Sequence, residues 1–160
     1  MTETDSAVVR KQVVVDATQE RAFTVFTENF GDFKPREHNL LRSPIARTVF
    51  EPRVGGRIVD IAEDGSECPW ARVLAFEPHE RVVFSWDIGP DWQLVADPAN
   101  ASEVEVRFIV EGPERTRLEL EHRNIDRHGP GWAAVSDAVA TDQGWPLYLD
   151  RYAALVAEAG

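Results

Sequence analysis

A strict two-residue alternation between residues 103 and 123 constrains the fold of this chain more than any other feature. Apolar residues alternate with charged ones on both sides of a Gly112-Pro113 break, which is the pattern of a β-hairpin with one apolar and one solvated face. The apolar positions are Val104, Val106, Phe108, Val110, Leu118 and Leu120, and the same face ends in His122. The stretch therefore predicts an antiparallel sheet that carries one polar, titratable group on its apolar side.

The charged face of this hairpin also predicts a strand register, because unlike charges attract and like charges repel when they lie directly opposite each other. One register makes every opposed charge pair complementary, whereas a slip of two residues would place Glu105 opposite Glu121. The favoured pairs are Glu105 with Arg123, Arg107 with Glu121 and Glu111 with Arg117, with His122 opposite Val106.

Outside the hairpin, the pattern predicts a strand and a capped helix, then short strands joined by tight turns, then a helical C-terminal end. Thr18 is a suitable helix N-cap, with Glu20 in the first turn. Gly55-Gly56 and Asp64-Gly65 mark turns between strands. The predicted elements are strands at 7–15, 45–51, 57–63, 70–76 and 81–88, a helix from 18 to 29–31, a second short helix or loop at 33–43, and helices at 132–142 and from 144 onward.

Length and charge bound the class of protein. At 160 residues the chain is long enough for one domain with its own core, and we expect a single domain over residues 1–160 with residues 1–6 disordered. Its 17 basic and 28 acidic residues give a net charge of −11, without a basic stripe. Binding to nucleic acids or to anionic membranes is therefore disfavoured. The sequence leaves open whether the protein forms a homodimer.

Metal and cofactor sites are not expected. Cys68 is the only cysteine, so it can form neither an internal disulfide nor a cysteine-based metal site, and its place before Pro69 predicts a turn. His38, His79 and His128 lie apart from His122 without the spacing of metal ligands. The N-terminus lacks a signal-peptide pattern, and no apolar run approaches the ~18 residues of a membrane span. We therefore expect a protein of the reducing cytoplasm.

Seven stretches resemble one known family: Asp16–Phe23, Ser43–Arg57 (SPIARTVFEPRVGGR), Asp64–Ser66, Trp70–Trp86, Glu103–Phe108, Thr116–Arg123 and Gly144–Leu155. The chain resembles the family related to the C-terminal domain of the activator of Hsp90 ATPase, within the START/Bet v 1-like (SRPBCC) superfamily. The motifs span nearly the whole chain in order. They consist of turns, core strands and helix seams, so they indicate a fold and a family rather than a reaction.

The resemblance implies an α+β helix-grip fold, in which a curved antiparallel sheet of about six to seven strands wraps around a long C-terminal helix. Two short helices follow the first strand. A cavity between sheet and helix is implied as well, in which superfamily members bind lipids, sterols, polyketides or other apolar molecules, and some catalyse cyclisation or hydrolysis. The members that activate Hsp90 carry an additional N-terminal domain that is not in this sequence, so an Hsp90-type chaperone partner is disfavoured.

His122 is the candidate polar group of such a cavity, where it could bind a ligand or move a proton near neutral pH. The alternative is a structural histidine that neighbouring groups satisfy. His122 is the candidate catalytic residue. No carboxylate is predicted on its face of the strand to orient its ring as a catalytic base. Aromatic and apolar residues are expected to line the cavity, with filling of the core as the alternative for each: Trp70, Phe84, Trp86, Trp92, Val106, Phe108, Leu120, Trp145 and Tyr148.

Three functions follow from these observations. The first is a binding module for an apolar or amphipathic small molecule, held between the sheet and the C-terminal helix. The second is a cyclase- or hydrolase-type enzyme that uses the same cavity. The third is a chaperone-activating or stress-response interaction protein, which the alternating charges of the outer hairpin face favour least because they are typical of a solvated surface. No GxSxG elbow or GxxxxGK phosphate loop is present.

Overall fold

Seven strands form one antiparallel sheet in the computed structural model, which describes residues 8–34, 42–90, 93–95, 97–141 and 144–159. The order across the sheet is β1-β7-β6-β5-β4-β3-β2, so the first and last strands are neighbours and β2 to β7 form a meander. The strands are β1 (Val9–Val15), β2 (Ile45–Phe50), β3 (Arg57–Ala62), β4 (Glu67–Glu77), β5 (Arg81–Trp86), β6 (Ser102–Gly112) and β7 (Arg115–Arg123).

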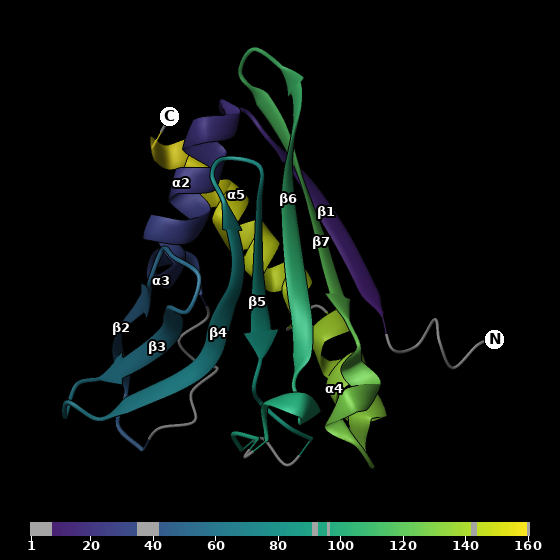
Figure 1. Cartoon of the computed structure of the whole chain (residues 1–160). Helices are drawn as coiled ribbons and strands as arrows, with labels where there is room; N and C mark the ends of the chain where they lie inside the picture. The colour runs from purple at the N-terminus through teal and green to yellow at the C-terminus, as the bar shows by residue number, and fades with distance from the viewer. Residues whose placement is uncertain (1–7, 35–41, 91–92, 96, 142–143, 160) are drawn as a thin grey trace.

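The α-helices pack on the inner side of this curled sheet, and Figure 1 shows α5 running behind the strands with α2 near its far end. They are α2 (Gln19–Glu28), α3 (Phe30–Phe33), α4 (Trp132–Ala140) and α5 (Trp145–Ala159), with 3₁₀ turns η1 (Pro98–Asn100) and η2 (Ile125–His128). This is the α+β helix-grip fold, with two short helices after the first strand, that the resemblance implies. No helix of the described residues is long and apolar enough to cross a membrane.

Helix α2 begins where the sequence predicts. The Thr18 hydroxyl accepts a hydrogen bond from the Arg21 backbone N–H at 3.2 Å, which satisfies one of the free amides of the first turn. Two contacts then join α2 to α5. The Tyr152 hydroxyl donates to the Ala22 carbonyl at 2.7 Å, and the Arg21 guanidinium donates to the Val156 carbonyl at 3.0 Å. These bonds hold the two helices together across the core.

Aromatic rings fill the core between the helices and the sheet. Phe26 of α2 is at its centre, with ring centroids 5.4 to 5.7 Å from Phe33, Phe108 and Tyr152. All four side chains are at most 2% exposed. Burial of each such ring stabilises the fold by roughly 1.5–3 kcal/mol, so the helices are fixed to the sheet mainly by apolar packing.

The register of the β6–β7 hairpin differs by two residues from the prediction based on charge. Glu105 lies opposite Glu121, and His122 lies opposite Val104 rather than Val106. The apolar face is unaffected, because a shift of two residues preserves the alternation of a strand. The predicted register is therefore wrong, although Glu105 with Arg123 and Glu111 with Arg117 still form ion pairs without being directly opposite. The placement of His122 on the apolar face agrees with the structure.

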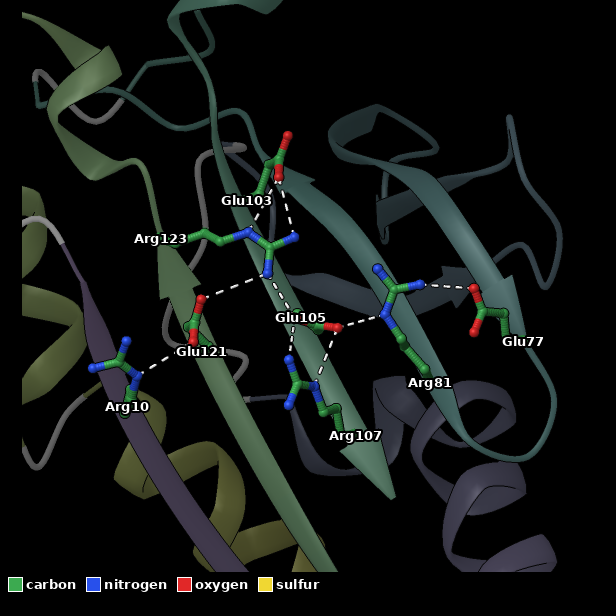
Figure 2. A network of polar contacts seen from close by, with 8 residues as sticks. All are labelled: Arg10, Glu77, Arg81, Glu103, Glu105, Arg107, Glu121 and Arg123. Atoms are coloured by element: carbon green, nitrogen blue, oxygen red, sulfur yellow. Dashed lines mark hydrogen bonds and ion pairs between the residues drawn. The ribbon is translucent and has the colours of Figure 1, made fainter. Parts of the chain in front are cut away.

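Two features of the hairpin explain this register. The turn is tight: Gly112 pairs with Arg115 after a bulge, which leaves two residues in the loop and fixes the pairing beyond it. The like charges are also compensated by a third strand, since Arg81 of β5 reaches the Glu105 carboxylate, as Figure 2 shows. A prediction based only on the charges of the β6–β7 hairpin does not include Arg81, because it belongs to a different strand.

Cys68 is not in the turn that the sequence predicts. It lies within β4, opposite Asp60 of β3, and it is buried. Proline has no backbone N–H to donate to a neighbouring strand. The strand tolerates Pro69 because the β3–β4 register shifts at this point, so no hydrogen bond from residue 69 is needed. A second short helix, α3, does follow α2, but it spans Phe30–Phe33 and so lies almost wholly before the range 33–43 in which a short helix or a loop was expected. Residues 1–6, 35–41 and Trp92 lie outside the described residues, so their predictions stay open.

Candidate functional site

A buried polar cluster lies at one end of the inner face of the sheet. We call it the histidine cluster, and its members come from five elements: Trp86 of β5, Ser102 of β6, His122 of β7, His128 of η2 and Trp145 of α5. The antiparallel order brings them together, because the end of β5, the start of β6 and the end of β7 lie at the same end of the sheet. All five residues are buried, and His122 and Ser102 are 0% exposed.

Three hydrogen bonds connect four members of the cluster. The Trp145 indole N–H donates to Nδ1 of His122 at 3.0 Å. Nε2 of His122 lies 2.7 Å from the Ser102 hydroxyl, and the same hydroxyl lies 2.8 Å from Nε2 of His128. His122 therefore has hydrogen-bond partners on both ring nitrogens, from α5 on one side and β6 on the other.

The indole determines the protonation state of His122. An indole N–H can only donate, so Nδ1 must accept and carries no proton. His122 is therefore a neutral ring with its proton on Nε2. Burial lowers the pKa of His122 to about 3, with a smaller effect from the neighbouring His128, and the ring stays uncharged near neutral pH. Burial likewise lowers the pKa of His128, opposed by the charge of Asp87.

Two buried ring nitrogens of the cluster have no hydrogen-bond partner among the described residues: Nε1 of the Trp86 indole, which is a donor, and Nδ1 of His128. Buried polar groups are normally hydrogen-bonded, so each of these needs an explanation. Asp87 is the partner of neither nitrogen, and its carboxylate accepts two hydrogen bonds from the Arg72 guanidinium, at 3.1 and 3.3 Å. The cluster thus offers polar N–H groups within an otherwise aromatic surrounding.

The residues predicted to line a cavity divide between this cluster and the rest of the core. Trp86 and Trp145 pack around His122, with ring centroids 5.4 and 5.9 Å from the imidazole. Phe108 instead packs against Phe23 and Phe26 of α2. The remaining described candidates are buried in the core as well: Trp70, Phe84, Val106, Leu120 and Tyr148.

Reasoning from the sequence did not assign Ser102 or His128 to the site. Ser102 continues the alternation of Val104, so the pattern could have placed its hydroxyl on the apolar face. His128 gives no such signal, because it ends a 3₁₀ turn between β7 and α4. Only the tertiary structure brings that turn back over the start of β6.

A second buried polar group lies towards the β2 edge of the sheet. Nζ of Lys34 is 3.2 Å from Oδ2 of Asp60, and both side chains are at most 5% exposed. Oδ1 of Asp60 accepts from the Thr48 hydroxyl at 2.8 Å and from the Trp70 indole at 3.2 Å. Three donors contact the Asp60 carboxylate, so this group connects Lys34, the C-cap residue of α3, to β2, β3 and β4. Among the described residues, no three potential metal ligands lie together.

Comparison with known proteins agrees with this architecture. Residues 16–157 match the family described as Activator of Hsp90 ATPase homolog 1-like protein. A solved structure of an anthrahydroquino-gamma-pyrone synthase, Txn09, complexed with SUM, is 40% identical in sequence with a TM-score of 0.65, covering 92% of this chain and 96% of that chain. No curated protein matches the chain.

Two further structures extend the comparison. CalC from Micromonospora echinospora, a self-sacrificing resistance protein, is 28% identical with a TM-score of 0.69, and the match covers 97% of both chains. The protein MLL2253 from Mesorhizobium loti is 20% identical with a TM-score of 0.65, over 96% of this chain and 98% of that one. At this lower identity the likeness shows the fold alone.

Proposed function

Because this chain belongs to the activator of Hsp90 ATPase homolog 1-like family, we propose that it binds an apolar or amphipathic small molecule between its sheet and α5. The fold of this family commonly binds hydrophobic ligands. The observation that carries the proposal is the pair of buried ring nitrogens without a hydrogen-bond partner among the described residues, Trp86 Nε1 and His128 Nδ1. An unsatisfied buried donor costs about 1–3 kcal/mol, and a ligand that supplies an acceptor removes that cost.

The surroundings of the two donors suit such a ligand. The Trp86 ring centroid lies 5.4 Å from that of Trp70 and 5.5 Å from that of Trp145, so indole faces and edges border the cluster on several sides. Aromatic walls contribute large apolar contact areas, while a few polar tips orient the ligand. These rings are closely packed, so binding requires them to move apart.

A thermal-shift screen of planar aromatic molecules and lipids tests this function. A molecule that binds the folded state raises the melting temperature, and the shift grows with ligand concentration. Trp86→Phe keeps an aromatic ring but removes one free donor, so it should weaken the shift, whereas Trp132→Phe outside the cluster should not. Absence of any concentration-dependent shift across the panel would contradict the proposal.

The second candidate function is a cyclase- or hydrolase-type enzyme at the same site, which the 40% identity to a protein named as a synthase favours. His122 would then act by orienting the Ser102 hydroxyl, because both of its ring nitrogens are hydrogen-bonded within the protein and a ring held neutral cannot serve as a cationic acid. Mass spectrometry of aromatic polyketides incubated with the protein tests this role. Conversion that is lost in His122→Asn supports it, and recovery of every compound unchanged argues for binding alone.

A further inference from the structure

The hydrogen bonds of the histidine cluster have a fixed direction. Nδ1 of His122 accepts from Trp145, so the proton of the neutral imidazole is on Nε2 and points to the Ser102 hydroxyl. The hydroxyl then accepts from His122, which leaves its own proton free for Nε2 of His128 at 2.8 Å. His128 accepts at Nε2 and, as a neutral ring, carries its proton on Nδ1.

The opposite orientation of the last bond is less favourable. If His128 donated from Nε2 to Ser102, the serine proton would have no acceptor among the described residues, and Nδ1 of His128 would be an unpaired acceptor. That arrangement leaves two buried polar sites unsatisfied, whereas the forward arrangement leaves one. Because each unsatisfied buried group is costly, the bonds run from Trp145 through His122 and Ser102 to His128.

We propose that the Nδ1–H group of His128 is the ligand-binding end of this hydrogen-bond chain and donates to an oxygen acceptor of the ligand, a carbonyl or a phenolate. The inference rests on the proposed function and specifies the ligand class. The Trp86 indole provides a second free donor at the same cluster, since Trp86 pairs with Ser102 across β5 and β6. A site with only free donors selects oxygen-bearing aromatic molecules over hydrocarbons and over amines, whose N–H groups would face N–H groups.

A matched pair of probes tests this selectivity. Fluorenone and fluorene have nearly the same planar shape, but only fluorenone carries a carbonyl oxygen. Calorimetric or fluorescence titration should give fluorenone an affinity about tenfold higher than that of fluorene, the effect of one hydrogen bond to an otherwise unsatisfied donor. His128→Phe should abolish this preference without weakening fluorene, and His79→Phe, at the β4–β5 turn, should retain it.

The outcomes separate this inference from the proposed function. If both probes bind with equal affinity, the proposed function stands for this ligand class, but a water molecule satisfies His128 and the inference is overturned. If neither probe binds, both are overturned for planar aromatic ligands. A preference for fluorenone that persists in His128→Phe but disappears in Trp86→Phe would transfer the role to the indole and contradict the inference.

A second measurement needs neither a ligand nor a variant. Long-range proton–nitrogen NMR spectra distinguish the two neutral forms of each histidine. The expected result for the wild-type protein at pH 7 is an Nε2–H form for His122 and an Nδ1–H form for His128. An Nε2–H form for His128 would reverse the last bond of the chain and overturn the inference.

Discussion

Glu105 of β6 lies directly opposite Glu121 of β7, and yet its side chain is only 5% exposed. Three guanidinium groups surround its carboxylate, from Arg81 on β5, Arg107 on β6 and Arg123 on β7, and Figure 2 shows them converging on it. Burial alone would raise the pKa of Glu105, but the hydrogen bonds from these arginines outweigh burial and lower it to about 2. The carboxylate therefore joins three strands on the outer face.

Replacement of this carboxylate should destabilise the sheet. Glu105→Gln removes the negative charge that three arginines share. We expect the free energy of unfolding at pH 7 to fall by about 1–2 kcal/mol. Solvent screening of the partly exposed arginines keeps the loss this small. Urea denaturation measures the loss. Glu111→Gln, at an exposed ion pair with Arg117, should change stability by no more than about 0.5 kcal/mol. Equal effects of the two changes would contradict the role of Glu105.

The pH dependence of stability should reveal the same carboxylate. Because the pKa of Glu105 in the folded state is below its ordinary value of 4.5, its stabilisation is present above pH 4.5 and is lost as the pH falls towards 2. Denaturation curves between pH 5 and 2 should therefore show a smaller loss of stability for Glu105→Gln than for the wild type. Parallel profiles of the two proteins would contradict this expectation.

The buried imidazole of His122 should govern stability at a higher pH. Its folded-state pKa of about 3 is below the ordinary value of 6.5, so the unfolded chain binds a proton that the folded protein does not. Stability is therefore complete above pH 6.5 and falls as the pH is lowered, by about 2 kcal/mol at pH 5. The NMR signals of His122 should not titrate between pH 7 and 5. A midpoint in that interval would contradict the neutral, fully bonded ring.

The indole of Trp145 should stabilise the protein through its N–H group as well as its ring. Trp145→Phe leaves Nδ1 of His122 without a donor and creates space in the core, so we expect a loss of about 2–4 kcal/mol. The same change at the partly exposed Trp132 should cost less than about 1 kcal/mol. Thermal or chemical denaturation measures both. In Trp145→Phe, His122 should also lose its fixed Nε2–H form in NMR spectra, which a purely steric role of the indole would not cause.

The contributions of Lys34 and Asp60 to the stability of the fold should depend on each other, because the two side chains form a buried ion pair. Lys34→Met leaves a buried carboxylate with only its neutral donors, and a loss of about 3 kcal/mol is expected. Adding Asp60→Asn should restore part of this stability, because an amide oxygen can still accept from Thr48 and Trp70. Arg10→Met, at an ion pair whose arginine is 73% exposed, is the control and should have little effect. Additive losses in the double variant would show that the pair is not coupled.

Local patterns in the sequence were sufficient for most of the fold. The alternation from residue 103 to 123 identified the apolar face, since side chains of a strand point alternately to its two sides whatever the partner strand is. Thr18 identified the start of α2 for a similarly local reason, because an N-cap bonds within its own turn. The family resemblance then implied a curved antiparallel sheet around a long C-terminal helix, which the structure confirms, whereas the order of strands across the sheet came only from the structure.

Register and hydrogen bonding were decided only by the tertiary structure. The register of β6 and β7 depends on a two-residue turn and on Arg81 from a third strand, which charge pairs within the hairpin do not contain. The partners of His122, Ser102 and Trp145, lie 20 and 23 positions away from it in the sequence. A sequence pattern can place a histidine on an apolar face, but which atoms satisfy its ring follows from how distant elements pack.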